Sequence, residues 1–184
     1  LYESMNDSFQ HLPVKLYRHD LVGQHIWAPL HWHRSIEILI AFKGRLAFHV
    51  SSENFDFTEE DWVIVNSSEL HSSRYINPDD HFKGISILIS SSFIDTWLGA
   101  KRCFYNPHIP ELTHQIKAIA EDLYHSNESE PYYDLYLMSQ VCTLLHLIGN
   151  HCIRENVPYE SPFAKEPAKA TEILDYIERN YQEQ

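Results

Sequence analysis

The spacing of hydrophobic residues changes part-way along the chain. From Val14 to Ser90, short runs of β-branched and aromatic residues alternate with turn-forming residues. Many short strands at such regular spacing are typical of an antiparallel barrel or sandwich. The predicted strands cover residues 14–17, 24–27, 35–42, 45–50, 54–57, 62–65, 72–76 and 84–90. We expect them to close into a barrel, because closure removes exposed strand edges.

After Ser92 the apolar residues take the spacing of helices. A first helix is predicted to begin near Pro110, because proline suits a first helical turn. Its apolar residues share one helical face; they are Leu112, Ile116, Ile119, Ala120 and Leu123. A longer helix is predicted from about Pro131 to Glu155, with Ser129 as its N-cap.

The longer helix carries two apolar stripes. The first stripe is Leu137, Val141, Leu144 and Ile148, and the second is Leu135, Met138, Cys142, Leu145 and Cys152. Two stripes offer more apolar surface than contact with one barrel needs. Two interpretations therefore stay open. Both stripes are buried within one chain, or one of them pairs with a second subunit in a coiled-coil-like contact.

The pattern predicts four segments. A barrel covers residues 1–92, a helical element covers 93–156, and a Pro- and Ser-containing linker covers 157–167. A further amphipathic helix is predicted over residues 168–184. That helix has no following segment to cover its apolar face, so we expect a domain to continue beyond it.

The charge balance argues against nucleic-acid binding by this part of the protein. Lys and Arg total 14 against 26 Asp and Glu, which gives a net charge of −12. Nucleic-acid binding needs basic residues to neutralise phosphates. A chain this acidic would repel the phosphate backbone.

Other features predict a soluble, non-secreted, cytoplasmic chain that does not bind a membrane. No stretch approaches the roughly 20 apolar residues that span a bilayer, and the first ten residues lack a signal-peptide pattern. The three cysteines, Cys103, Cys142 and Cys152, have no CxxC spacing. Neither a disulfide framework nor a thiolate zinc site is therefore predicted.

Potential ligands are concentrated in His31, His33 and Glu37, with His71 further along the chain. Alternation along a strand places His31 and His33 on one face, and Glu37 keeps that parity. We expect these side chains to converge inside the barrel. Three imidazoles and a carboxylate match the ligands that zinc, iron, nickel and manganese favour.

These residues also follow a known motif. The segment HWHRSIEILIAFKG from His31 to Gly44 resembles the first cupin motif. The segment Glu60–His71 resembles the second motif, but with three departures. Glu60 replaces the usual Gly, Asn66 replaces the Pro, and Ser68 replaces the next Gly. The second motif is therefore degenerate.

Longer segments of the sequence resemble the AraC-type transcription regulators. HWHRSIEILIAFKGRLAFHV and EEDWVIVNSSELHSS are similar to their N-terminal domain, and AKATEILDYIERNYQEQ is similar to the first helix of their DNA-binding domain. The resemblance implies a mainly β fold with C-terminal helices: a cupin-like double-stranded β-helix, or jelly-roll barrel, plus a helical dimerisation element. It implies a small effector, often a sugar, in the barrel. It also implies a homodimer, and DNA binding only through a helix-turn-helix domain beyond Gln184.

Two interpretations of His31, His33, Glu37 and His71 follow from the resemblance. They bind the effector as a polar lining, with no cofactor required, or they hold a divalent metal. Tyr75 shares the parity of His71 and is a further candidate for effector binding. We expect a regulator and not an enzyme. The alternative is a metal-dependent cupin oxygenase or isomerase that uses the same four residues.

Overall fold

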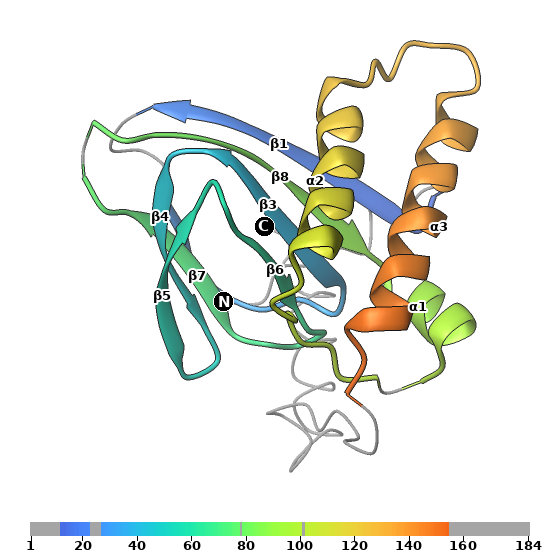
Figure 1. Ribbon diagram of the computed structural model, residues 1–184, viewed down its shortest axis with the longest axis horizontal. Coiled ribbons are helices and arrows are strands. Elements are labelled where there is room, and N and C mark those ends of the chain that lie inside the picture. Colours follow the sequence, from blue (N-terminus) through green and yellow to red (C-terminus); the bar gives the residue numbers. More distant parts are fainter. Residues whose placement is uncertain (1–11, 23–26, 78, 101, 155–184) are drawn as a thin grey trace, which may run out of the picture.

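The computed structural model describes residues 12–22, 27–77, 79–100 and 102–154 (Figure 1). Its strands are β1 (Val14–Val22), β2 (Trp27–His31), β3 (Ile36–Lys43), β4 (Arg45–Val50), β5 (Glu53–Thr58), β6 (Trp62–Val65), β7 (His71–Tyr75) and β8 (His81–Ile89). Its helices are α1 (Ser91–Leu98), α2 (Pro110–His125) and α3 (Tyr133–His151). None of the described helices has the length and apolar character that crossing a membrane requires.

The strands form two four-stranded antiparallel sheets. Their orders are β1-β8-β3-β6 and β2-β7-β4-β5. The first sheet brings together the first and last strands, because β1 pairs with β8. The pairing runs from Val14 opposite Ile89 to Val22 opposite His81. This order is that of an eight-stranded jelly roll. The predicted fold class, a double-stranded β-helix followed by helices, is confirmed.

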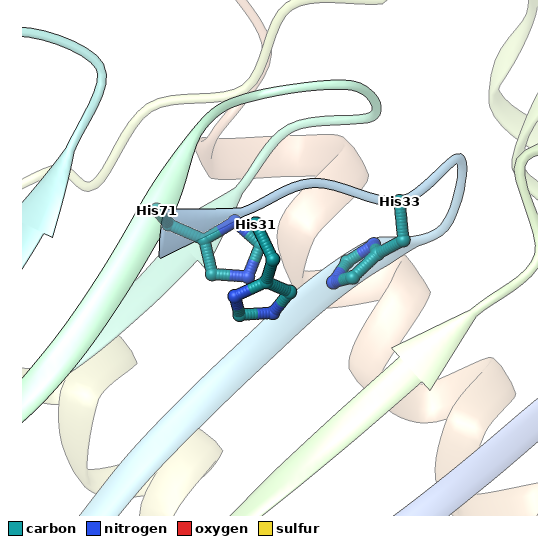
Figure 2. A group of neighbouring side chains, drawn as sticks. All are labelled: His31, His33 and His71. Atoms are coloured by element: carbon teal, nitrogen blue, oxygen red, sulfur yellow. The ribbon is translucent and has the colours of Figure 1, made fainter. Parts of the chain in front are cut away.

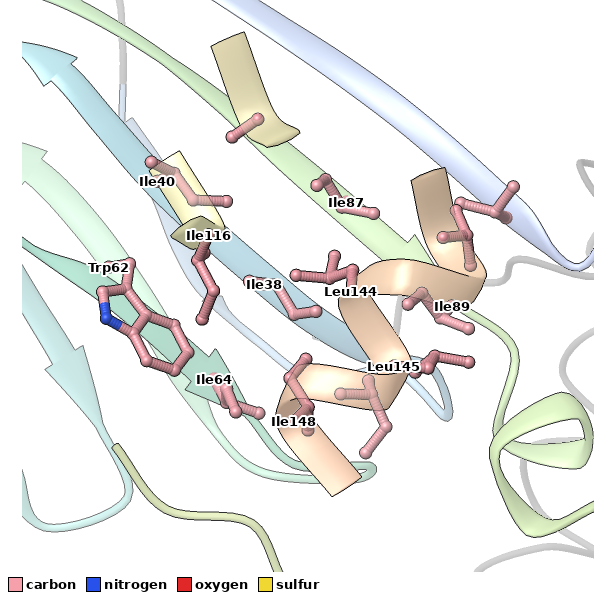
Figure 3. Packing of buried hydrophobic residues seen from close by; sticks show 14 of the residues in the cluster. Ile38, Ile40, Trp62, Ile64, Ile87, Ile89, Ile116, Leu144, Leu145 and Ile148 are labelled. Atoms are coloured by element: carbon pink, nitrogen blue, oxygen red, sulfur yellow. The ribbon is translucent and has the colours of Figure 1, made fainter. Parts of the chain in front are cut away.

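Strand β3 is buried on both faces and contributes to two hydrophobic cores. Ile38 and Ile40 belong to a core shared with helices α2 and α3 (Figure 3). Leu39 and Ala41 belong to a second core between the two sheets. Because successive side chains of a strand point to opposite faces, Glu37 also faces the interior of the barrel. Burial on both sides explains why this strand is an almost continuous apolar run.

Helices α2 and α3 lie over the outer face of the β1-β8-β3-β6 sheet (Figure 1). The first stripe of α3 is buried there in full: Leu137, Val141, Leu144 and Ile148. The second stripe is divided. Leu145 and Cys152 are buried, whereas Leu135 is 70% exposed and Cys142 is exposed. The second stripe therefore belongs only partly to the core.

Arg18 of β1 connects the barrel to the turn between α2 and α3. Its Nε donates to the carbonyl of Tyr124 at 3.0 Å, and its Nη2 donates to the carbonyl of Leu123 at 3.1 Å. Both carbonyls lie in the last turn of α2, where the helix leaves carbonyl groups without helical partners. Its Nη2 also donates to the Tyr133 hydroxyl at 3.3 Å, at the start of α3. One guanidinium thus holds three elements together.

The structure corrects three predictions about element bounds. Of the predicted strand over 24–27 only Trp27 lies in β2, which runs on to His31, and residues 24–26 lie outside the described residues. The sequence pattern predicts no element over residues 91–98, but these residues form α1, with the Ser90 side chain accepting from the Phe93 amide at its N-terminus. Ser129 is wrong as the N-cap of the long helix, because α3 begins at Tyr133 after the left-handed residue Tyr132. The predicted linker (157–167) and the helix over 168–184 lie outside the described residues.

Candidate functional site

A cavity of about 260 Å³ lies between the two sheets. One part of its wall is apolar and comes from Leu39, Leu46, Phe48, Phe82 and Leu88. Another part is polar and comes from His19, His31, His33, Glu37, His71 and Ser86. No lysine or arginine is among the described residues that line it. The volume is just below the about 300–1,000 Å³ of typical ligand pockets, so a small guest fits.

Three histidines from two parts of the chain, His31 and His33 in one and His71 in the other, meet in this cavity (Figure 2). The ring centroids of His31 and His71 are 4.1 Å apart, and those of His33 and His71 are 4.9 Å apart. His31 ends β2 and His71 begins β7, where the two residues are paired. His33 lies in the connection between β2 and β3 and is 1% exposed. The connection, rather than strand alternation, brings His33 beside the other two rings.

Each of these imidazoles has its Nδ1 within hydrogen-bond distance of a main-chain carbonyl. His31 is paired with Pro29 at 2.7 Å, His33 with Ser35 at 3.1 Å, and His71 with Glu69 at 2.9 Å. A carbonyl can only accept, so each Nδ1 carries a proton. The neutral form of each ring therefore has its lone pair on Nε2, the arrangement that also orients histidines as metal ligands.

Glu37 completes the polar end of the cavity. Its Oε2 is 3.1 Å from Nε2 of His33 and 3.3 Å from Nε2 of His71. Burial opposes the charge, but the two imidazoles outweigh it and hold the pKa of Glu37 well below its usual value. Burial likewise lowers the pKa of His71, but the Glu37 carboxylate outweighs it and the net shift is upward. Each of the two groups therefore favours the charged form of the other.

This arrangement attracts positive charge and hydrogen-bond donors. An ionised carboxylate only accepts, so Nε2 of His33, 3.1 Å from the Glu37 oxygen, bonds to it only when that nitrogen carries a proton. Nε2 of His71 is buried and has no hydrogen-bond partner among the described residues, although the Glu37 oxygen is within ion-pair distance. A proton, a metal ion or a donor group of a guest can occupy the space between these acceptors.

Four of the five predicted site residues therefore come together, and Tyr75 does not join them. Tyr75 does not line the cavity; its hydroxyl donates to the carbonyl of Leu21 at 3.1 Å. Its ring packs against the core between the sheets. Its side chain faces the interior of the barrel, as its parity predicts, but it packs in the core next to the cavity and does not line it. A role for Tyr75 in effector binding stays a prediction.

His19 is a cavity residue that the sequence pattern does not identify. Its Nε2 is 3.0 Å from the hydroxyl of Ser86, on the paired strand β8. Burial lowers the pKa of His19, so its neutral form is favoured. The available signal is its parity with Tyr17 and Leu21, which also line the cavity. That signal could be used only once the interior face of β1 was known.

A jelly roll with a histidine-lined cavity between its sheets defines a cupin-like domain, and comparison with known proteins identifies the family. Residues 14–145 match the AraC-like ligand binding domain. The chain belongs to this family, which confirms the resemblance to AraC-type regulators. It is also similar to the uncharacterized HTH-type transcriptional regulator YdeC of Bacillus subtilis (strain 168), with 36% identity over 62 residues. That match covers 33% of this chain and 21% of the relative.

Solved structures with likeness to the chain include two cupins. One is an RmlC-like cupin family protein with a double-stranded β-helix fold from Methanocaldococcus jannaschii, with a TM-score of 0.37 and 20% identity; 42% of this chain and 70% of that chain are covered. The other is a cupin-like protein from Thermotoga maritima, with a TM-score of 0.39 and 17% identity; 44% of this chain and 59% of that chain are covered.

Proposed function

We propose that this chain is the effector-sensing and dimerisation part of an AraC-type transcription regulator, and that its effector binds in the cavity. The observation that carries the proposal is the cavity itself, which lies inside the matched family domain and has a polar end of His31, His33, Glu37 and His71. The regulator works on DNA through a helix-turn-helix domain outside the described residues. A cytoplasmic location follows from that role.

The proposed effector is a small sugar. Hydroxyl groups are donors, and the polar end of the cavity is rich in acceptors, chiefly Glu37 and the Nε2 atoms. The rings of Phe48 and Phe82 supply apolar wall on which the C–H face of a sugar can lie. An anionic effector fits less well, because Glu37 is ionised and no described lining residue is a lysine or arginine.

Thermal unfolding with sugars tests this proposal. A pentose or hexose that binds the native state stabilises it by about 2.7 kcal/mol at a hundredfold excess over Kd, which raises Tm by roughly 5–10 °C for a chain of this size. Glu37→Gln should lose the shift, whereas His146→Ala, on the exposed side of α3, should keep it. Amino acids and aliphatic acids of similar size serve as comparison. A shift with these, and none with any sugar, would contradict the sugar assignment.

Two copies of the chain pair through the α3 outer face, which we define as Tyr132, Leu135, Tyr136 and Cys142. Leu135 and Tyr132 are 70% and 81% exposed, although large apolar side chains seldom cluster on a surface without a partner. An effector that favours one arrangement of barrel and helices would then move both DNA-binding domains together. Only a difference in effector affinity between two arrangements can drive such a change.

A second candidate is a metal-dependent cupin enzyme, and one observation favours it. His31, His33 and His71 each offer a ligand atom, and these atoms lie within 4.8 Å of one another. The buried Nε2 of His71 lacks a hydrogen-bond partner among the described residues, as a ligand atom would in metal-free protein. The three imidazoles thus fit a divalent metal, with Glu37 beside them. Such a metal would supply a Lewis acid to an oxygen of the guest.

Elemental analysis separates the two candidates. Protein purified without a metal-affinity tag is expected to contain less than stoichiometric metal if the four residues bind an effector directly. One equivalent of iron, manganese or nickel, lost in His71→Ala and kept in His146→Ala, would favour the enzyme. That result would leave the family assignment unchanged, because it concerns the use of the cavity and not the fold.

A further inference from the structure

The turn between β6 and β7 is tied to two of the cavity histidines. The amide of Ser68 donates to the carbonyl of His33 at 2.7 Å. Nδ1 of His71 donates to the carbonyl of Glu69 at 2.9 Å. Ser68 has a left-handed φ of 64°, so the turn is a specific backbone shape and not a loose connection. A displacement of the His71 ring, or of the His33 main chain, is therefore transmitted to this turn.

The other side of the turn is tied to the segment before α2. The side-chain amide of Asn66 donates to the carbonyl of Phe104 at 3.2 Å, and the amide of Phe104 donates to Oδ1 of Asn66 at 2.8 Å. These are the two bonds that a neighbouring strand residue would make. Asn66 and Phe104 are 6% and 3% exposed. Asn66 is itself fixed, because its main-chain and side-chain amides both donate to Oε2 of Glu69.

Phe104 is in turn paired with the segment that leaves α3. It forms an antiparallel bridge with Ile153. The amide of Tyr105 donates to the carbonyl of Cys152, and the amide of Arg154 donates to the carbonyl of Cys103, both at 2.9 Å. Residues 152–154 are the last described residues before the predicted linker. A continuous set of hydrogen bonds therefore runs from the cavity histidines to the point where the chain leaves this domain.

We propose that Asn66 is a positioning residue that couples the occupancy of the cavity to the exit segment, residues 152–154. A guest that displaces His33 or His71 displaces the turn, and the buried amide of Asn66 passes the displacement to Phe104 and its partner Ile153. Coupling is reciprocal, so a change at the exit segment alters the cavity as well. The inference rests on the proposed function only in naming an effector as the guest.

The departure from the second cupin motif supports this role. Asn66 occupies the position where that motif has proline. A proline there would lack both the main-chain amide that binds Glu69 and the side-chain amide that binds Phe104. The degenerate position is thus the one that makes the link, and it does so without contacting the cavity.

Amide hydrogen exchange in a double-mutant cycle tests the coupling without any effector. The amide of Arg154 reports the exit segment, and the amide of Ile87, in the centre of the first sheet, reports global unfolding. His71→Ala should speed the exchange of Arg154 relative to Ile87 by about fivefold, the effect of losing one hydrogen bond. In an Asn66→Ala background, His71→Ala should add less than about twofold, because the link is already broken.

Three further variants test whether the coupling is specific to His71 and Asn66. His19→Ala removes a cavity histidine that is bonded to Ser86 instead of the turn, so it should leave the ratio unchanged. His71→Asn, whose side-chain amide can replace Nδ1, should restore slow exchange. Asn66→Ser removes the side-chain amide that binds Phe104 without placing a second carboxylate beside Glu69, and it replaces Asn66→Ala if the latter does not fold.

Additive effects of His71→Ala and of the variant at Asn66 would overturn the coupling, as would an effect of His19→Ala equal to that of His71→Ala. Neither outcome depends on which guest binds. Conversely, absence of sugar binding in the thermal experiment would overturn the proposed effector and leave the cycle intact. The two proposals therefore fail separately.

Discussion

At the scale of single residues, the polar end of the cavity combines one carboxylate with three imidazoles. The Nδ1–H groups of three imidazoles donate hydrogen bonds to main-chain carbonyls. The Glu37 carboxylate lies against Nε2 of two of these rings, His33 and His71. Burying an ionised carboxylate is costly unless a counter-charge accompanies it. The charged form of His71 can supply it, which is the reason that the pKa of Glu37 is lowered and the pKa of His71 is raised.

The stability of the metal-free protein should therefore depend on this pair. The raised pKa of His71 stabilises the fold below its ordinary value of 6.5, and this contribution is lost as pH rises through the folded-state pKa. The lowered pKa of Glu37 stabilises the fold above its ordinary value of 4.5, and this contribution is lost as pH falls through the folded-state pKa. The pair contributes most between these values.

Urea unfolding at several pH values checks this prediction. The difference in unfolding free energy between the protein and Glu37→Gln should be largest near pH 5.5, between the two ordinary values, and should shrink toward high pH. NMR titration should also place the pKa of His71 above 6.5 in the protein and lower in Glu37→Gln. Glu53→Gln, on the exposed start of β5, is the control. An unchanged His71 titration in Glu37→Gln would contradict the pairing.

At the scale of elements, Arg18 joins β1 to the turn between α2 and α3. Its guanidinium binds two carbonyls at the end of α2 and the hydroxyl of Tyr133. The fork of donors matches several acceptors at once, which a lysine ammonium on a flexible stem does not reproduce. The end of α2 is thus held by a strand whose other face lines the cavity at Tyr17 and His19.

Arg18→Ala should lower the unfolding free energy by about 1–3 kcal/mol, because it removes the charged donor shared by the carbonyls of Leu123 and Tyr124. Arg18→Lys should recover less than half of the loss. Chemical denaturation followed by circular dichroism measures both. Lys15→Ala removes a cation from the same strand that lies over the ring of Tyr17, and it should cost under about 1 kcal/mol. Full recovery of stability in Arg18→Lys would show that the charge alone matters and would contradict the role of the fork.

At the scale of the whole molecule, the two faces of α3 differ in burial. The face that carries Leu144 completes the core against the first sheet (Figure 3). The α3 outer face keeps Leu135 exposed, and the described residues contain no segment that covers it. A second copy would bury it by the side-chain interlocking that apolar stripes of paired helices allow.

Sedimentation of the chain should give twice the mass of 21.7 kDa if the α3 outer face pairs two copies. Leu135→Asp should then yield monomers with unchanged circular dichroism, because the side chain is outside the core. Val22→Asp changes a residue of almost equal exposure, 68% against 70%, at the end of β1, and it should remain dimeric. Dissociation by both variants, or by neither, would argue against this face.

The local patterns of the sequence determined the elements that are long or strongly periodic. Most strands of the barrel, both long helices and the change of period near Ser92 follow from spacing alone, because burial of a face dictates the period. Helix α1 was not predicted, since it has eight residues and buries only Ile94. The motif HWHRSIEILIAFKG also indicated that His31, His33 and Glu37 meet, although His33 reaches the others from a connection and not from a strand.

Contacts between distant segments were decided by the tertiary structure alone. His19 joins the cavity because β1 pairs with β8, 67 positions away at Ser86, and Asn66 meets Phe104 across 38 positions. Which stripe of α3 is core likewise depends on how the helix lies on the sheet. Periodicity predicts that a side chain is buried, but it does not predict which residues contact that side chain. Those contacts depend on the path of the whole chain.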